Sequence, residues 1–233
     1  MADKKTSLTI DITSDLACPW CYVALKRLEN AIEQFRGSLE VHLRWHPYMI
    51  DMKTQAEGED YLKYNRRRWG GDGWVQGMKD SAAQDGALFS NWGRQNPASV
   101  WANTFHAHRL LYLVQTRCSW RRMDRVKLRL FDEYYEKGVN ISGVDELIRI
   151  GLGCELSVRR DEDVEWEGGV TDDELERWMR SARDGHSELL AEDSAAKRRG
   201  ISGVPYFELP SGLTVNGAQT TKHWVKIFRQ VLG

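Results

Sequence analysis

One stretch near the N-terminus joins a strand pattern, two cysteines and a helix pattern: LTIDITSDLACPWCYVALKRLENAIEQF, residues 8–35. Apolar and polar residues alternate over 8–12, which is typical of a half-buried strand. Apolar residues then recur at helical spacing over 23–35. Cys18 and Cys21 therefore lie where a strand passes into a helix.

The start of a helix favours a reactive thiolate. Unpaired backbone N–H groups and the helix dipole place partial positive charge there, which favours the thiolate form of Cys18. Pro19 suits the first helical position, because its missing N–H is not needed there. Cys21 follows one turn later on the same face, within reach of a disulfide to Cys18. The spacing predicts that Cys18 attacks a substrate disulfide and Cys21 resolves the mixed disulfide.

Other uses of a CXXC pair fit the sequence less well. A zinc site needs a second pair of ligands, and the remaining cysteines, Cys118 and Cys154, are isolated. A structural disulfide is disfavoured because closing so short a loop removes little chain entropy. We therefore expect redox chemistry, no metal site, and inert buried thiols at Cys118 and Cys154.

The composition is that of a globular protein with no strong charge bias. The 233 residues, 41% of them hydrophobic, can build one domain with a large insertion or two small domains. The balance of 33 basic and 34 acidic residues gives no sign of binding to nucleic acid or an anionic membrane. No apolar stretch predicts a signal peptide or a membrane span, and four cysteines make no disulfide framework. We expect a reducing compartment, most simply the cytoplasm.

The rest of the chain divides by its periodicity. A second strand at 39–45 would complete a right-handed β-α-β unit with two parallel strands. Helices are expected at 100–115 and 121–135, and a capping box at Thr171–Glu174. A hairpin and a closing helix are predicted within 204–232. These patterns define a discontinuous domain and an inserted helical domain: 1–50 with 198–233, and 51–197.

Three segments carry a family resemblance: DLACPWCY at 15–22, NTFHAHRL at 103–110 and GVPYF at 203–207. They resemble the FrnE-like branch of the DsbA-like thioredoxin superfamily, and NGAQ at 216–219 fits the same branch. This branch is related to 2-hydroxychromene-2-carboxylate isomerases and kappa-class glutathione transferases. The resemblance runs from residue 8 to 232 and implies an α/β thioredoxin fold with a large helical insertion. It also implies the activity of a protein-disulfide oxidoreductase.

The resemblance further implies a cis peptide bond before Pro205, which costs little before proline. This bond would turn the backbone of Val204 toward the cysteines, where it could pair with an extended peptide or with glutathione. A proline in an apolar strand can alternatively mark a sheet edge.

Trp20 departs from the family pattern. Oxidising DsbA proteins carry a histidine between the cysteines, which stabilises the thiolate, whereas Trp20 brings no charge. We therefore predict a more reducing potential within the range of about −270 to −120 mV for such motifs. The related isomerases and transferases usually have serine where Cys18 stands and lack the resolving cysteine, so the two thiols favour dithiol chemistry.

Several polar residues are weaker candidates. His106 and His108 point to different faces of one helix, and either could be a base or a packed residue. Arg109 could hold a glutathione carboxylate or lie on the surface. The run Arg66–Arg68 before Trp69 could bind an acidic partner but better fits a solvated helix end. The predicted substrate-binding set joins these with the residues around the cysteines: Pro19, Trp20, Val204, Pro205, Arg109 and His108.

Three functions stay open from the sequence. The leading one is a thiol-disulfide oxidoreductase acting on protein or small-molecule disulfides, with no bound cofactor and with glutathione as a candidate co-substrate. The second is a glutathione-dependent isomerase or transferase, in which Cys18 only positions glutathione. The third is a non-enzymatic module that binds unfolded chains. The substrate, the direction of electron flow and the oligomeric state are left open.

Overall fold

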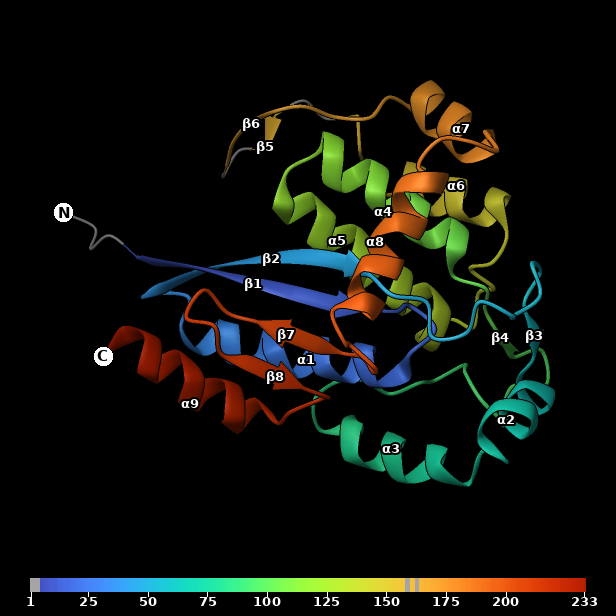
Figure 1. Ribbon diagram of the computed structural model, residues 1–233, viewed down its shortest axis with the longest axis horizontal. Coiled ribbons are helices and arrows are strands. Elements are labelled where there is room, and N and C mark those ends of the chain that lie inside the picture. The colour runs from blue at the N-terminus through green and yellow to red at the C-terminus, as the bar shows by residue number, and fades with distance from the viewer. Residues whose placement is uncertain (1–4, 158–159, 162–163) are drawn as a thin grey trace.

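The computed structural model describes residues 5–157, 160–161 and 164–233. Within these ranges the main sheet has four strands in the order β2-β1-β7-β8 (Figure 1). β2 is parallel to β1, whereas β7 is antiparallel to both β1 and β8. The bounds are β1 Thr6–Ser14, β2 Leu39–Pro47, β7 Tyr206–Glu208 and β8 Thr214–Asn216.

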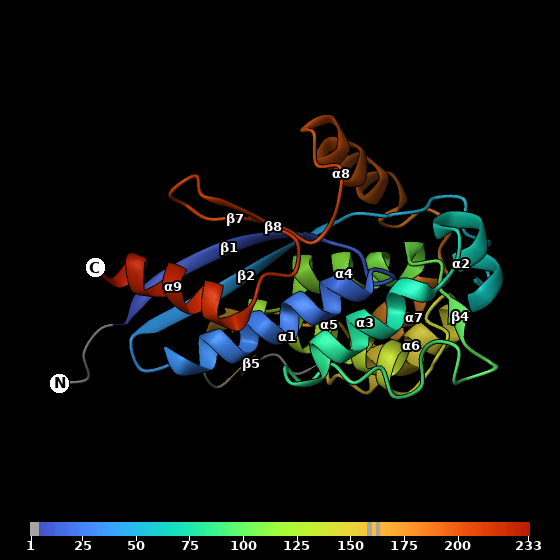
Figure 2. The same ribbon diagram turned by 90° about the horizontal axis from the view of Figure 1, so that it is seen from below.

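The predicted β-α-β unit is confirmed. β1 and β2 pair in parallel from Thr6 opposite Leu39 to Ser14 opposite Pro47. Helix α1 (Pro19–Gln34) packs on one face of the sheet beside α9 (Thr221–Leu232) (Figure 2). α8 (His186–Arg198) lies on the opposite face (Figure 2). The alternating apolar side chains of the two strands are buried: Leu8, Ile10, Ile12, Leu39, Val41, Leu43 and Trp45.

The C-terminal hairpin and closing helix also lie where the sequence predicts them. β7 and β8 pair through Phe207 opposite Val215. The hydroxyl of Thr220 caps α9 by accepting a hydrogen bond from the backbone N–H of His223 at 3.3 Å. The buried ring of Trp224 meets the ring of Phe207 edge-on, with 4.8 Å between centroids. This contact holds α9 against the sheet.

The segment between β2 and α8 forms the helical insertion. α7 starts at the predicted capping box, where Thr171 Oγ1 accepts from Glu174 N and Glu174 Oε2 accepts from Thr171 N. None of the helices in the described ranges has the length and apolar character that a membrane crossing requires. The helices are α2 Tyr61–Trp69, α3 Gly73–Ala83, α4 Phe105–Arg117, α5 Trp120–Phe131, α6 Val144–Leu152 and α7 Asp172–Arg180. The short strands are β3 Glu59–Asp60, β4 Val100–Trp101, β5 Arg160–Asp161 and β6 Val164–Glu167.

The helix predicted over 100–115 begins later than expected. Val100 and Trp101 form β4, which pairs with β3 instead of continuing a helix. A polar turn follows, in which the side chain of Asn103 accepts a hydrogen bond from Phe105 N at 3.0 Å. α4 therefore starts at Phe105, because backbone pairing and this turn outweigh the apolar spacing of the preceding residues.

The helix predicted over 121–135 is interrupted near its end. α5 stops at Phe131 and passes into a π-helical turn, η1 (Asp132–Glu136). Glu136 accepts a hydrogen bond from the hydroxyl of Tyr22 at 3.0 Å. Tyr135 donates its hydroxyl to the carbonyl of Leu16 at 3.1 Å. These two hydrogen bonds link the insertion to the turn that carries the cysteines.

One cluster of buried apolar side chains includes residues of the sheet domain and of the insertion. Ile12 and Phe207 of the sheet belong to it, as do Leu110 and Phe131 of the inserted helices. The predicted boundaries near residues 50 and 198 therefore stay a prediction.

Candidate active site

The two cysteines lie at the first turn of α1. Cys18 is the N-cap residue, in an extended conformation, and Pro19 follows at the first helical position. The backbone N–H of Cys21 donates to the carbonyl of Cys18 at 2.9 Å, which closes this turn. Cys18 is 7% exposed and Cys21 is 3% exposed. Cys18 is therefore the thiol nearer to the surface.

Cys21 is a thiol that holds its proton strongly. Burial, followed by the hydrogen bond and charge of Cys18, raises the pKa of the Cys21 thiol well above its usual value. The two side chains contact each other through this hydrogen bond. Cys21 must therefore lose its proton to a neighbour before it can act as a nucleophile.

The loop before β7, near the C-terminal end of the chain, contacts Cys18. The Cys18 thiol donates a hydrogen bond to the carbonyl oxygen of Val204 at 3.5 Å. The peptide bond between Val204 and Pro205 is cis. Pro205 is buried, and its carbonyl accepts a hydrogen bond from Gly217 N at 2.9 Å. The backbone of Val204 thus faces the reactive end of the dithiol.

A groove of about 370 Å³ adjoins Cys18. Trp20 is 37% exposed and Trp69 is 45% exposed, so the groove presents aromatic surface to solvent. The guanidinium carbon of Arg68 lies 4.5 Å above the ring of Trp69. The groove is lined by Cys18, Pro19, Trp20, Tyr48, Ile50, Arg68, Trp69, Trp74, Trp101, Ser202, Gly203 and Val204.

The arginine run at the end of α2 has two roles. Arg67 forms ion pairs with Asp51 at 3.0 Å and with Glu59 at 2.7 Å, and its guanidinium lies over the ring of Tyr64. Arg68 instead lines the groove. The run therefore brings one cation, Arg68, to the groove that Cys18 borders.

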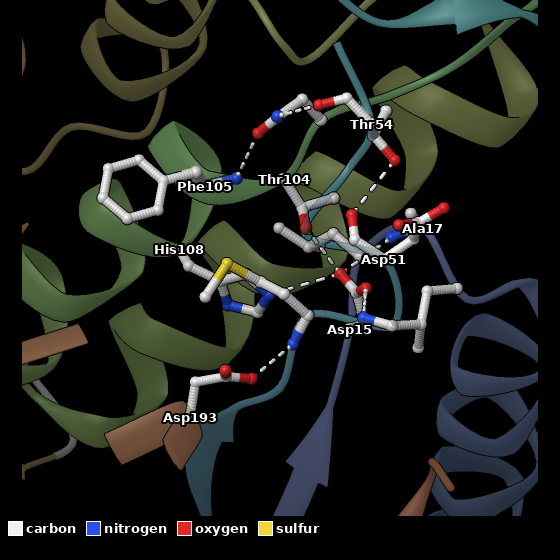
Figure 3. A network of polar contacts seen from close by, with 12 residues as sticks. Asp15, Ala17, Asp51, Thr54, Thr104, Phe105, His108 and Asp193 are labelled. Carbon is white, nitrogen blue, oxygen red and sulfur yellow. Dashed lines mark hydrogen bonds and ion pairs between the residues drawn. The ribbon is translucent and has the colours of Figure 1, made fainter. Parts of the chain in front are cut away.

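The carboxylate of Asp15 organises the turn before the cysteines (Figure 3). Its Oδ1 accepts hydrogen bonds from Thr104 Oγ1 at 2.7 Å, Ala17 N at 3.2 Å and His108 Nε2 at 3.3 Å. Its Oδ2 accepts one from Ile50 N at 2.8 Å. This one side chain connects β1, the residues after β2 and the start of α4.

The charge states of this network follow from burial and hydrogen bonding. Burial alone raises the pKa of Asp15, but the hydrogen bond and charge of His108 and the other donors hold that pKa below its usual value. Burial lowers the pKa of His108. The pair is therefore a carboxylate with a neutral imidazole that donates from Nε2.

A family model of the DSBA-like thioredoxin domain matches residues 9–158. The chain belongs to this DSBA-like thioredoxin family. A comparison with curated proteins found no match.

Several solved structures share the fold. A probable DsbA oxidoreductase from Streptomyces coelicolor is 22% identical, with a TM-score of 0.75, and the match covers 97% of this chain and 90% of that one. The cytosolic disulfide reductase DsbM from Pseudomonas aeruginosa, solved with GSH, is 18% identical, with a TM-score of 0.58 and coverage of 97% and 99%. A 2-hydroxychromene-2-carboxylate isomerase is 13% identical, with a TM-score of 0.59 and coverage of 97% and 94%.

Two of the predicted substrate-binding residues of this DSBA-like chain, Arg109 and His108, do not line the groove. Arg109 is 1% exposed, and its guanidinium donates to the carbonyls of Trp178, Ser181 and Asp184 at 2.6–2.9 Å. It closes the end of α7, which corrects the expectation that Arg109 holds a substrate carboxylate. His108 is 3% exposed and contacts Asp15, so it positions the cysteine turn instead of meeting substrate.

One buried lysine of this DSBA-like chain is not among the residues predicted from the sequence. Lys127 of α5 is 1% exposed and interacts electrostatically with Cys21 and Cys18. A signal was present in the sequence, because Lys127 lies one helical turn from both Met123 and Phe131 on the apolar stripe of α5. A lysine on such a stripe is normally excluded by the cost of burying its charge.

Proposed function

We propose that this protein is a thiol-disulfide oxidoreductase in which Cys18 is the nucleophile and Cys21 the resolving thiol. The Cys18 thiolate attacks one sulfur of a substrate disulfide, forms a mixed disulfide and releases the other sulfur as a thiolate. Cys21 then loses its proton and attacks Cys18 Sγ, which releases the second substrate thiolate. Two electrons pass from the dithiol to the substrate, and an external thiol restores the reduced pair.

The position of Cys18 supports this assignment most strongly. It caps the first turn of α1, borders the groove and donates a hydrogen bond to the carbonyl of Val204. Cys21 is buried one turn behind it, where it can reach Cys18 but not a bulky substrate. A nucleophile that borders the groove and a resolving thiol behind it are what the two-step exchange requires.

The groove suggests the class of substrate. We propose that the backbone of Val204 pairs with an extended peptide or glutathione segment, as in strand addition. The aromatic surfaces of Trp20 and Trp69 would then contact apolar neighbours of the substrate sulfur, and Arg68 would attract a carboxylate. Glutathione as the restoring thiol, and a reducing compartment such as the cytoplasm, fit this proposal.

The test is a redox titration in graded glutathione buffers, read by thiol alkylation and intact mass. We expect a two-electron transition between the Cys18–Cys21 dithiol and its internal disulfide. The matched control is Cys154→Ser, which removes a thiol outside the groove and should leave the transition unchanged. A persistent glutathione adduct on Cys18 with no ring closure would reject the proposal.

A glutathione-dependent isomerase or transferase is the second candidate, because Cys18 alone borders the groove while Cys21 lies behind it. Cys21→Ser separates the two functions. Disulfide reduction should collapse in this variant under the first proposal, whereas a glutathione conjugation or isomerisation activity should survive under the second.

A further inference from the structure

One buried arginine links segments that form walls of the groove. Arg27 lies on α1, the helix that begins at the cysteines, and is 5% exposed. Its guanidinium is a planar fork that donates hydrogen bonds in several fixed directions. The side chain donates to the end of α3 and to the turn before α9, and both helices lie next to α1 (Figure 2).

The first of these contacts holds α3. Arg27 Nη2 donates to the carbonyl of Ser81 at 2.8 Å and to its hydroxyl at 2.9 Å, near the C-terminal end of α3. The last carbonyls of a helix lack intrahelical partners, and a cation there complements the helix dipole. Trp74, in the first turn of the same helix, lines the groove. Arg27 therefore fixes the helix that supplies this part of the wall.

The second contact holds the turn between β8 and α9. Arg27 Nη1 donates to the carbonyl of Ala218 at 2.8 Å. The residue before it, Gly217, donates its backbone N–H to the carbonyl of Pro205 at 2.9 Å. Pro205 directly follows Val204, whose carbonyl accepts the hydrogen bond of the Cys18 thiol. Arg27 thus supports the turn that in turn supports the backbone opposite Cys18.

The carboxylate of Asp85 fixes the direction of the arginine fork. Its Oδ2 accepts from Arg27 Nε at 2.8 Å, and its Oδ1 lies 3.2 Å from the hydroxyl of Thr221 at the start of α9. The same hydroxyl lies 3.2 Å from the carbonyl oxygen of Arg27. The side chains of Arg27 and Asp85 are 7% and 12% exposed. A sheltered ion pair with this many hydrogen bonds is confined to one geometry.

We propose that Arg27 is a positioning residue that holds the Val204 backbone and Trp74 in place around Cys18, a role that rests on the oxidoreductase function proposed above. It acts through the loop before β7 and through α3, not by contact with substrate. A backbone segment already held in its binding conformation loses little conformational entropy when an extended peptide pairs with it. Loosening the arginine contacts should therefore weaken the binding of extended substrates and leave the attack by Cys18 intact.

Single-turnover reduction of two disulfides tests the proposal. Reduced protein, in a Cys154→Ser background that removes a partly exposed thiol, is mixed with excess disulfide over a range of concentrations. One substrate is an extended peptide disulfide with apolar flanking residues. The other is a small symmetric aryl disulfide, which can reach Cys18 without pairing with Val204. The concentration dependence gives a half-saturation concentration and a limiting rate for each substrate.

Arg27→Lys keeps the charge beside Asp85 but loses the fork that reaches Ser81 and Ala218. We expect its half-saturation concentration for the peptide disulfide to rise about tenfold, with the limiting rate and the reaction with the aryl disulfide nearly unchanged. Hydrogen–deuterium exchange should become faster over residues 202–217 in this variant. A milder variant, Thr221→Val, removes one hydroxyl at the edge of the network and should raise the half-saturation concentration about threefold.

Arg109→Lys is the matched control. Arg109 is also a buried arginine that donates to backbone carbonyls, but these lie at the end of α7 and not at the groove. Both lysine variants should lower the urea midpoint of unfolding, because both lose buried hydrogen bonds. Only Arg27→Lys should weaken the reaction with the peptide disulfide and speed exchange over residues 202–217.

The results that would overturn the proposal are distinguishable from failure of the oxidoreductase function. Wild-type protein that reduces neither disulfide would reject that function itself. Wild-type protein that reduces only the aryl disulfide, or an unchanged half-saturation concentration in Arg27→Lys, would reject the positioning role alone. Equal rises in Arg27→Lys and Arg109→Lys would also reject it, since loss of stability would then explain both. If Arg27→Lys does not fold, an unchanged reaction of Thr221→Val with the peptide disulfide rejects the role.

Discussion

The Cys18 thiol donates a hydrogen bond to the carbonyl oxygen of Val204 at 3.5 Å, although 186 positions separate the two residues in the chain. This contact joins the start of α1 to the loop before β7. It places the backbone of Val204 beside Cys18. A backbone in this position is what recognition of an extended peptide by strand addition needs. Any substrate that reaches Cys18 must displace or share this contact.

The residue between the cysteines should tune the redox potential. Trp20→His would place a group that can carry positive charge beside the Cys18 thiolate, stabilising the reduced form. We expect the potential to become more oxidising by roughly 30 mV, which is a tenfold change in the equilibrium constant for two electrons. Equilibration with glutathione buffers measures it, with Trp20→Phe as the uncharged control. An unchanged or more reducing potential in Trp20→His would contradict this explanation.

The aromatic groove should govern substrate affinity. Trp69→Ala removes a 45% exposed ring from the groove without touching the cysteines. We expect KM for a peptide disulfide with apolar flanking residues to rise about tenfold, with kcat nearly unchanged, as for the loss of one aromatic contact. Leu213→Ala removes a comparably exposed apolar side chain at the β7–β8 turn and should have no effect. Equal kinetics of the two variants would argue against this groove as the binding site.

The buried network of Asp15 and His108 predicts a loss of stability in acid. The pKa of His108 is below its usual value of about 6.5 in the folded protein, so unfolding takes up a proton as the pH falls below that value. Each unit of this depression weakens the fold by roughly 1 kcal/mol in acid. The low pKa of Asp15 adds a second loss below about pH 4.

Denaturant unfolding at pH 7.5 and pH 5.5 tests the first of these losses. His108→Gln can still donate to Asp15 but does not titrate, so the difference between the two pH values should shrink in this variant. A wild-type protein equally stable at both pH values would show that His108 is not held neutral by the fold.

Lys127→Met should stabilise the protein. The lowered pKa of Lys127 means that folding is penalised at neutral pH, where the unfolded chain carries the full charge freely. Replacing a buried charge by an apolar group of similar shape commonly stabilises a protein by about 1–3 kcal/mol. Urea unfolding at pH 7 measures the change. Greater stability would show that the fold does not depend on this buried charge, whereas marked destabilisation would indicate a structural role.

Much of the fold could be predicted because its signals are local. The alternation of β1, the proline after Cys18 and the helical stripe of α1 lie within 28 consecutive residues, and the parallel pairing with β2 follows from their order. The capping box at Thr171 could also be predicted from the sequence, because both of its hydrogen bonds lie within one helical turn. The prediction of a helix from residue 100 was wrong at its start, because Val100 and Trp101 pair as a strand with β3, about forty residues earlier in the chain.

The sequence by itself determined that two thiols lie at the first turn of α1, because two cysteines one helical turn apart are a property of four adjacent residues. Only the tertiary structure decided what surrounds them. Arg109 donates to carbonyls at the end of α7, His108 contacts Asp15, and Lys127 is buried over the rings of Trp45 and Phe131. These outcomes depend on which faces of distant helices are buried together, and packing between helices far apart in the chain is not encoded in any local pattern.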